Sequence, residues 1–244
     1  MSDETKKTMD EALEDLFSNA NTNNEIIAKL PSRGVGYPGK KKEVTIRAMT
    51  FEDEKALASL RVGEDIIESV LSRCVADIDI DNLYGPDKLY LLLKLRELSF
   101  GDSFKIAAKC TKCKQENDLE ILLSQLPVTE ADEDFTDPKE ITLPQLNTTA
   151  MVRLPRSGDS DLLSSHDKIL DNLWRFVKKI GEYEDPKVIV KAIKKLKSAD
   201  IRTILNSLLV DDFGIETTAL FICSNCGEEN KVNVPITESF FTVS

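Results

Sequence analysis

The sequence of 244 residues contains the same cysteine motif twice, at a fixed separation. The first copy reads Phe100-Gly101, Cys110-x-x-Cys113, Glu116-Asn117, and the second reads Phe213-Gly214, Cys223-x-x-Cys226, Glu229-Asn230. Each element of the second copy lies 113 residues after its counterpart, since 213 − 100, 223 − 110 and 229 − 116 are all 113. A Cys-x-x-Cys pair supplies half of the ligands of a tetrahedral zinc site. The pattern therefore predicts an internal duplication whose two halves meet at one metal ion.

The match between the two copies extends towards the N-terminus. Leu143-Pro144 follows Leu30-Pro31, and Asp200 follows Asp87, by the same 113 residues. Both stretches show the alternation typical of a strand, then helical patterns, then an apolar helix capped by an aspartate. The expected elements are strands over 44–49 and 150–154, helices over 88–98, 168–180, 186–196 and 201–210, and strands on either side of each cysteine pair. We therefore predict an α+β fold of two similar halves, each with a small β element and helices, joined by a four-cysteine zinc ribbon.

These patterns divide the chain into four segments. They are a flexible N-terminal segment (1–28), a first repeat half (29–125), an acidic linker (126–142) and a second repeat half (143–244). In the N-terminal segment, an apolar helical face is expected at Met9, Leu13, Leu16 and Phe17. That segment either orders against a partner or stays disordered. The linker carries six acidic residues and two prolines, which is typical of a solvated connector.

The four paired cysteines are the candidate ligands of one structural Zn²⁺. They are Cys110, Cys113, Cys223 and Cys226. The two pairs are separated by 109 residues (223 − 113 − 1), whereas common Cys₄ motifs place them roughly 12 to 20 residues apart. Tertiary structure would therefore have to assemble the site. Two metal sites completed by other chains, or cysteines without metal, are the alternatives. The fifth cysteine, Cys74, lies among apolar residues and is expected to be a buried, inert thiol.

The charge of the chain disfavours binding to a phosphate backbone, because its formal net charge is −11 and its pI about 4.8. We interpret the lysines at 40–42 and within 191–197 as solvated turn and helix charges. No apolar run reaches the ~18 residues that would span a bilayer, and the acidic N-terminus lacks a signal-peptide core. We therefore expect a protein of a reducing cytosol, with neither nucleic acid nor membrane as its partner, whose cysteines bind metal.

The sequence lacks the motifs that would indicate catalysis. Its only histidine, His166, has Ser165 and Asp167 as chain neighbours, which does not by itself give triad geometry. There is no glycine-rich phosphate-binding loop, and Trp174 is expected in a core or an interface. A thiol oxidoreductase would place a cysteine at a helix N-terminus, whereas each pair here is expected between strands. We therefore expect a protein that is not an enzyme.

Two segments carry a family resemblance: LPSRGVGYPGKKKEVTIRAMTFEDEKAL (30–57) and YLLLKLRELSFGDSFKIAAKCTKCKQENDLEI (90–121). Through them the chain resembles the baseplate proteins of T4-like bacteriophages, a family that includes a baseplate hub subunit and a related hub assembly factor. The resemblance implies a structural or assembly component of the hub region of a contractile tail. It implies other baseplate or tail proteins as partners, and a location in the virion tail and, during assembly, in the host cytoplasm. It brings no catalytic residues.

Two regions are candidate contacts with those partners, the N-terminal segment and Phe240-Phe241. Adjacent phenylalanines point to opposite faces of a strand. The C-terminal end is therefore expected either to add an edge strand to a partner or to form the last strand of the ribbon. One alternative function is a zinc-ribbon adaptor in transcription or translation, which the net charge of −11 disfavours. A second alternative is a thiol oxidoreductase, which the expected strands around each cysteine pair disfavour.

Overall fold

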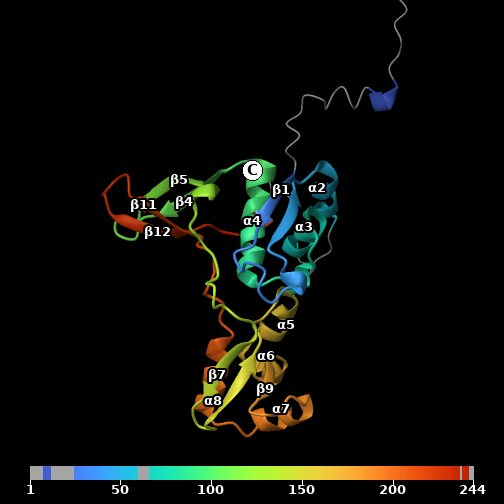
Figure 1. Cartoon of the computed structure of the whole chain (residues 1–244). Helices are drawn as coiled ribbons and strands as arrows, with labels where there is room; N and C mark the ends of the chain where they lie inside the picture. Colours follow the sequence, from blue (N-terminus) through green and yellow to red (C-terminus); the bar gives the residue numbers. More distant parts are fainter. Residues whose placement is uncertain (1–7, 12–24, 60–65, 237, 242–244) are drawn as a thin grey trace, which may run out of the picture.

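The computed structural model describes residues 8–11, 25–59, 66–236 and 238–241, and its main parts are arranged as a T (Figure 1). An N-lobe (25–100) lies above a C-lobe (139–208), and a ribbon arm of two β-hairpins (103–122 and 218–233) extends to one side. The arm takes one hairpin from each half of the sequence. The chain therefore runs from the arm to the C-lobe and then returns to the arm.

The N-lobe consists of a three-stranded antiparallel sheet and helices packed on it. Its strands, in the order β1-β2-β3, are β1 (Glu25–Lys29), β2 (Glu43–Arg47) and β3 (Val75–Ala76). Its helices are α2 (Phe51–Ala58), α3 (Ile66–Cys74) and α4 (Gly85–Phe100). α4 contacts β1 and β2 and contributes four buried leucines to the core, namely Leu91, Leu92, Leu93 and Leu95. This apolar helix leads directly into the ribbon arm.

A buried carboxylate, that of Asp53, joins three elements of the N-lobe. The backbone N–H and the hydroxyl of Thr50 each donate to Asp53 Oδ2 at 2.9 Å, which caps the start of α2. Arg47 of β2 donates to Asp53 Oδ2 at 2.6 Å, and Arg73 of α3 donates to Oδ1 at 2.9 Å. These two guanidinium groups compensate the charge that would otherwise be costly to bury.

The C-lobe has its own three-stranded antiparallel sheet, again in chain order. Its strands are β7 (Lys139–Leu143), β8 (Thr148–Val152) and β9 (Val177–Ile180). Its helices are α5 (Ser160–Leu163), α6 (His166–Asn172), α7 (Pro186–Ile193) and α8 (Ser198–Ser207). A separate core cluster holds Leu143, Phe176 and Ile204. No helix within the described residues is long and apolar enough to cross a membrane.

An aspartate in the first turn of the last helix holds the sheet in each lobe. Asp87 Oδ1 accepts a hydrogen bond from Ser32 N at 3.0 Å in the N-lobe, and Asp200 Oδ1 accepts one from Gln145 N at 2.8 Å in the C-lobe. The sequence predicted both aspartates as helix caps, but α4 begins at Gly85 and α8 at Ser198. The carboxylates instead bind the loop that follows each Leu-Pro pair.

Residues 177–180 form strand β9, although the helical pattern predicted one helix over 168–180. α6 ends at Asn172, a 3₁₀ turn follows, and Val177 and Ile180 are then buried as β9 pairs with β8. Apolar residues three apart fit a helix face, so the sequence pattern did not distinguish the two states. Pairing with a strand about 28 residues earlier in the chain decided between them.

The boundary expected at residue 28 falls inside β1. This strand begins at Glu25, and all five of its residues pair with β2. Of the apolar helical face expected earlier in the chain, only Met9 lies within the described residues, where it is exposed. Leu13, Leu16 and Phe17 lie outside them.

The stretch 126–142, expected as a solvated acidic connector, belongs in part to the folded interior. Its β6 (Val128–Thr129) pairs with β10 (Gly214–Ile215), and the β7 strand starts within it. The Asp137 carboxylate is only 3% exposed, because Tyr84 and Arg156 surround it. The Asp137 Oδ2 atom accepts hydrogen bonds from the Tyr84 hydroxyl and from Arg156 Nη2, both at 2.6 Å.

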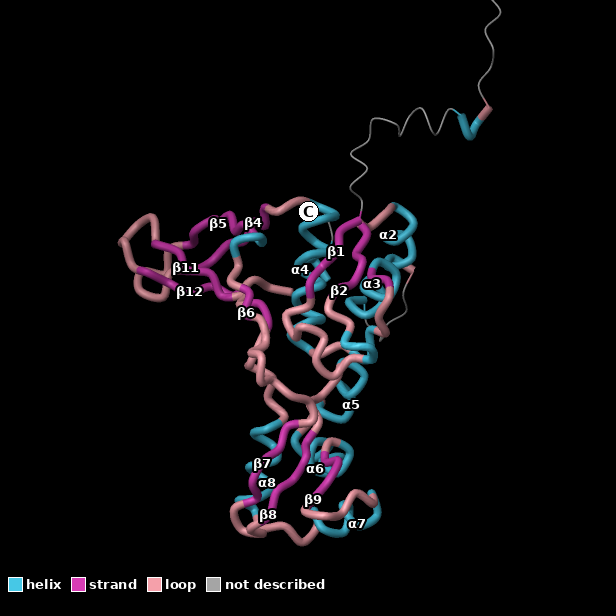
Figure 2. Tube along the Cα trace, viewed as in Figure 1, coloured by secondary structure: helices cyan, strands magenta, loops and turns pink. Residues whose placement is uncertain are grey.

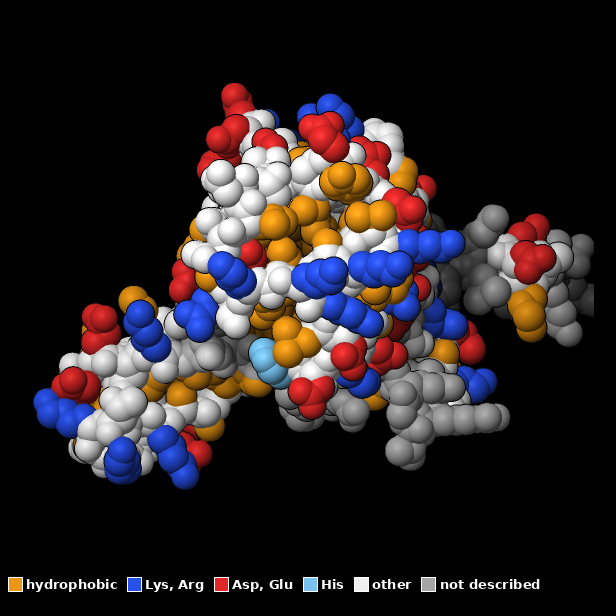
Figure 3. All heavy atoms as spheres, turned by 90° about the horizontal axis from the view of Figure 1, so that it is seen from below, with side chains coloured by type: hydrophobic (Ala, Val, Ile, Leu, Met, Phe, Trp, Pro, Cys, Tyr) orange, Lys and Arg blue, Asp and Glu red, His pale blue; other side chains and the backbone are white. Residues whose placement is uncertain are grey.

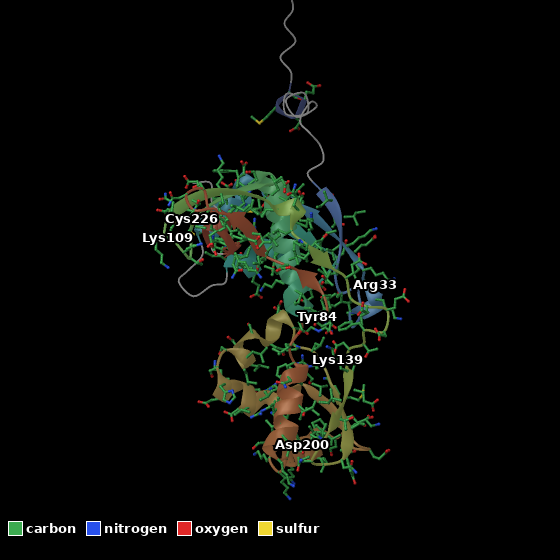
Figure 4. The ribbon with its side chains drawn as sticks, turned by 90° about the vertical axis from the view of Figure 1, so that its left-hand side faces the viewer. Arg33, Tyr84, Lys109, Lys139, Asp200 and Cys226 are labelled. Atoms are coloured by element: carbon green, nitrogen blue, oxygen red, sulfur yellow. The ribbon has the colours of Figure 1, made fainter. Side chains whose placement is uncertain are left out.

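Arg156 thereby connects the two lobes. It follows β8 of the C-lobe, and its guanidinium carbon lies 3.6 Å from the centre of the Tyr84 ring in the N-lobe. Its Nη2 atom also donates to the Gly36 carbonyl at 3.2 Å. Figure 4 shows Tyr84 at the junction between the lobes. A planar cation can stack on a ring and bind a carboxylate at the same time, which a lysine cannot reproduce.

Phe240 and Phe241, expected as a partner contact or a last strand, are buried in the protein's own core. They lie in a 3₁₀ turn (Glu238–Phe241), and their side chains are 0% and 3% exposed. Phe240 packs edge-on against Phe104 of the first hairpin, with ring centres 4.9 Å apart. The turn places both rings on the apolar surface between the arm and α4, which a single strand face could not do. These two residues are therefore not a surface for partners.

Candidate metal centre

The structure brings the sulfur atoms of Cys110, Cys113, Cys223 and Cys226 within 4.8 Å of one another. Two contacts join the pairs, at 3.7 Å between the sulfurs of Cys110 and Cys226 and at 3.6 Å between those of Cys113 and Cys223. A tetrahedral ion with bonds of about 2.3 Å to four sulfurs would place those sulfurs about 3.8 Å apart. The four cysteines thus lie close enough to bind one metal ion, and their spacing fits tetrahedral coordination.

Two β-hairpins carry the cysteines at their tips. The first consists of β4 (Ser103–Lys109) and β5 (Glu116–Leu122), and the second of β11 (Thr218–Ile222) and β12 (Glu229–Asn233). Both hairpins are paired over their full length, and Figure 2 shows them side by side in the arm. Figure 1 shows the turns between the paired strands at the outer end of the arm. Because the two hairpins lie side by side, the cysteine turn of one hairpin lies next to that of the other.

The two cysteine turns have the same backbone geometry. Cys110 N donates to the carbonyl of Gln115 at 2.9 Å, and Cys223 N donates to that of Glu228 at 2.9 Å. The residue after each second cysteine then adopts a positive φ, 63° at Lys114 and 70° at Gly227. Glycine adopts this conformation without strain, whereas a lysine does not. The turn thus keeps its shape in the first copy despite the less favourable residue.

Two asparagines brace the turns across the arm, and sequence reasoning assigned them no role. Asn117 Oδ1 accepts hydrogen bonds from both the N–H and the hydroxyl of Ser224 at 2.9 Å. Asn230 Oδ1 accepts the equivalent two bonds from Thr111 at 2.8 Å. The Nδ2 atom of Asn230 lies 3.6 Å from Cys110 Sγ, and that of Asn117 lies 3.8 Å from Cys223 Sγ. The signal was present, because an asparagine stands four residues after the second cysteine in both copies.

Backbone N–H groups favour the thiolate form of the first cysteine in each pair. The N–H of Cys113, helped by Lys112 and Asn230, lowers the pKa of the Cys110 thiol to about 6. The N–H of Cys226 likewise lowers the pKa of the Cys223 thiol. A thiolate is the form that binds metal, so the lowered pKa values of Cys110 and Cys223 favour cation binding. Across the hairpins, Lys112 also pairs with Glu228 at 2.8 Å.

The other side chains that the sequence singled out lie away from the metal centre. Cys74 ends α3 and is buried, and desolvation raises the pKa of its thiol to about 11. His166 is exposed at the start of α6. Trp174 is half-buried against the core of the C-lobe. The expectations of an inert Cys74 thiol and a packed Trp174 side chain agree with these positions.

Taken together, these features define an α+β protein in which two distant Cys-x-x-Cys hairpins meet in a four-cysteine ribbon able to bind a metal ion. The model of the family described as T4 bacteriophage base plate protein matches residues 23–242. The chain belongs to this family, which confirms the resemblance drawn from its sequence. No curated protein and no solved structure matches the chain.

Proposed function

We propose that the protein is a non-enzymatic structural or assembly component of the hub region of a contractile-tail bacteriophage baseplate. Family membership supports the baseplate setting. In this proposal the protein acts with other baseplate or tail proteins, in the virion tail and, during assembly, in the host cytoplasm. Its ribbon is held by one structural Zn²⁺ bound to Cys110, Cys113, Cys223 and Cys226.

One observation carries the zinc proposal. Four sulfurs from turns 113 residues apart lie within 4.8 Å of one another, and two of the distances between the turns, 3.7 and 3.6 Å, are close to the ~3.8 Å of tetrahedral coordination. A sulfur-only tetrahedral site suits zinc or an iron–sulfur centre, and four thiolates leave zinc no open position for water or substrate. Such an ion stabilises structure rather than reacting, which supports a non-catalytic role.

We propose further that the two halves of the chain arose by internal duplication. Several hydrogen bonds recur with both partners displaced by 113 residues. They include Ser32–Asp87 with Gln145–Asp200, and the Cys110–Gln115 turn with the Cys223–Glu228 turn. The three-stranded sheets of both lobes also share their strand order. A duplicated ancestor would supply two matching hairpins to one metal ion, which accounts for the approximate two-fold of the ribbon.

The proposal is tested in two stages, on the purified protein and on phage. Elemental analysis should find one zinc and no iron per chain. Iron in place of zinc would indicate an iron–sulfur centre. Deletion of the gene should then abolish assembled baseplates, and complementation should restore them. Normal infectious tails without the protein would refute the baseplate role. Tight, salt-sensitive binding to nucleic acid would instead support the zinc-ribbon adaptor.

A further inference from the structure

Five exposed lysines gather at the end of the C-lobe that points away from the N-lobe. We call this set the basic end, and it consists of Lys187, Lys191, Lys194, Lys195 and Lys197. Figure 4 shows Asp200, in the first turn of α8, at this end of the molecule. Figure 3 views the same end directly and shows Lys and Arg side chains in a row beside exposed hydrophobic ones. The basic end is thus accessible to another macromolecule.

Two lysines of α7 and the lysine that caps its C-terminal end lie on one face of the helix. Lys187, Lys191 and Lys194 are spaced i, i+4 and i+7, so their side chains project from one stripe. Ile189, on the opposite side, is buried in the C-lobe core. The helix therefore packs through its apolar face and presents its basic face to solvent.

No carboxylate among the described residues pairs with these five lysines. Some other lysines do form ion pairs, as in Lys179 with Glu184 and Lys112 with Glu228. The one acidic residue between Lys191 and Arg202 is Asp200, and it is buried on Gln145 N. The charge of the basic end is therefore not neutralised within the C-lobe.

The basic end also opposes the charge of the rest of the molecule. From residue 175 to residue 202 there are nine Lys or Arg and four Asp or Glu, a net charge of +5. Because the whole chain carries −11, the remainder carries −16. Such an asymmetry orients a molecule towards a partner of opposite charge.

Helix stabilisation accounts for only part of this arrangement. Lysines in the last turn of a helix interact favourably with its dipole, which explains Lys191 and Lys194. Lys187 lies in the first turn of α7, directly after Pro186, where the dipole disfavours a cation. A basic face maintained along the whole helix indicates binding rather than capping.

We propose that the basic end docks an acidic protein surface, one rich in exposed Asp and Glu, on a partner subunit. A protein partner is favoured over nucleic acid because the rest of this chain would repel a polyanion longer than the patch. α7 itself is about 12 Å long, which matches a local cluster of carboxylates. Exposed Tyr183 lies in the turn that leads into α7 and can supply an apolar contact at the rim. The inference rests on the proposed function in one respect only, namely that the partner is taken to be a subunit of the baseplate.

Binding of the full-length, metal-loaded protein to dye-labelled poly-L-glutamate, followed by fluorescence anisotropy, tests this proposal. The triple variant K191E/K194E/K195E should weaken binding about tenfold or more, and added salt should weaken the wild type similarly. The matched control K40E/K42E/K55E changes the net charge equally but alters exposed lysines of the N-lobe. It should retain most of the binding.

Equal losses in the two triple variants would overturn the proposal, because they would show a response to net charge alone. Tighter binding of a single-stranded oligonucleotide or of anionic phospholipid vesicles than of polyglutamate would also overturn it. The milder K191Q/K194Q/K195Q variant, with circular dichroism to verify folding, keeps the test valid if charge reversal unfolds α7. Because this assay needs neither phage nor baseplate, its failure is distinct from failure of the proposed function.

Discussion

Asn117 on the first hairpin places its side-chain nitrogen 3.8 Å from the sulfur of Cys223 on the second hairpin. The contact joins residues separated by 106 positions in the chain, and Asn230 makes the corresponding approach to Cys110 at 3.6 Å. Outer residues that hydrogen-bond to metal ligands orient them and tune their basicity. The two asparagines therefore join the two hairpins into a single unit independently of a metal ion.

Substitution of Asn117 should weaken metal binding without removing a ligand. Asn117→Asp keeps an oxygen for Ser224 but loses the N–H donor towards Cys223 and adds a charge near the thiolates. We expect the affinity for zinc to fall by about 10- to 100-fold, measured by competition with a chromophoric chelator. Asn206→Ala, on the exposed face of α8, is the control and should keep the wild-type affinity. An unchanged affinity in Asn117→Asp would show that the bracing is irrelevant to the metal.

Removal of one proposed ligand should abolish the shared site. Cys110→Ser and Cys223→Ser come from different hairpins, yet each should leave less than one zinc per chain by elemental analysis. Each should also lower the midpoint of thermal unfolding, since structural zinc contributes to folding. Cys74→Ala should keep its full metal content, because this buried thiol lies in α3. A full equivalent of zinc in either serine variant would exclude a site shared by the two hairpins.

The two positive-φ residues of the cysteine turns should respond in opposite directions. Lys114→Gly should stabilise the metal-loaded protein by about 1 kcal/mol, because glycine relieves the strain at φ 63°. Gly227→Ala should cost about 1 kcal/mol, and the strain lies in the backbone alone because a Cβ there meets no atom within 4 Å. Urea unfolding followed by circular dichroism measures both. Effects of the same sign would contradict the shared turn geometry.

Acid should destabilise the N-lobe through Asp53. The Arg47 guanidinium, with Thr50 and Arg73, holds the pKa of the Asp53 carboxyl well below its usual range. The stabilisation is therefore fully present above the unfolded-state pKa of about 3.9 and is lost as the pH falls towards the folded value. Asp53→Asn should be less stable at neutral pH, and its free energy of unfolding should change less between about pH 5 and pH 2. Parallel pH profiles for the two proteins would show that Asp53 does not contribute.

Loss of Arg156 should uncouple the lobes. Arg156→Met leaves the Asp137 carboxylate buried without its cation, which should cost about 3 to 5 kcal/mol in urea unfolding. Adding Asp137→Asn should recover part of this loss, since the unpaired charge is then removed. Hydrogen exchange should show faster exchange at the lobe junction in the single variant. If the double variant is no more stable than Arg156→Met, the buried charge is not the cause.

Local patterns predicted a substantial part of this structure. The apolar helix α4 follows from residues within a few helical turns of one another, so its signal is complete in the sequence. The positions of the hairpins follow in the same way from the Cys-x-x-Cys spacing. By contrast, Val177 to Ile180 fitted a helix and became a strand, because only β8, elsewhere in the chain, supplied its hydrogen-bonding partner.

The sequence by itself determined the two cysteine turns, the repeated spacing and the acidic charge, because each depends only on residues close together in the chain or on composition. Tertiary structure decided which cysteine lies opposite which, that Asp137 is buried beneath Arg156, and that Phe240 and Phe241 pack inside rather than on a partner. These outcomes depend on how much apolar surface and how many charges each distant pairing buries or compensates. The free energy of each pairing therefore depends on the fold of the whole chain, and a local sequence pattern does not contain that information.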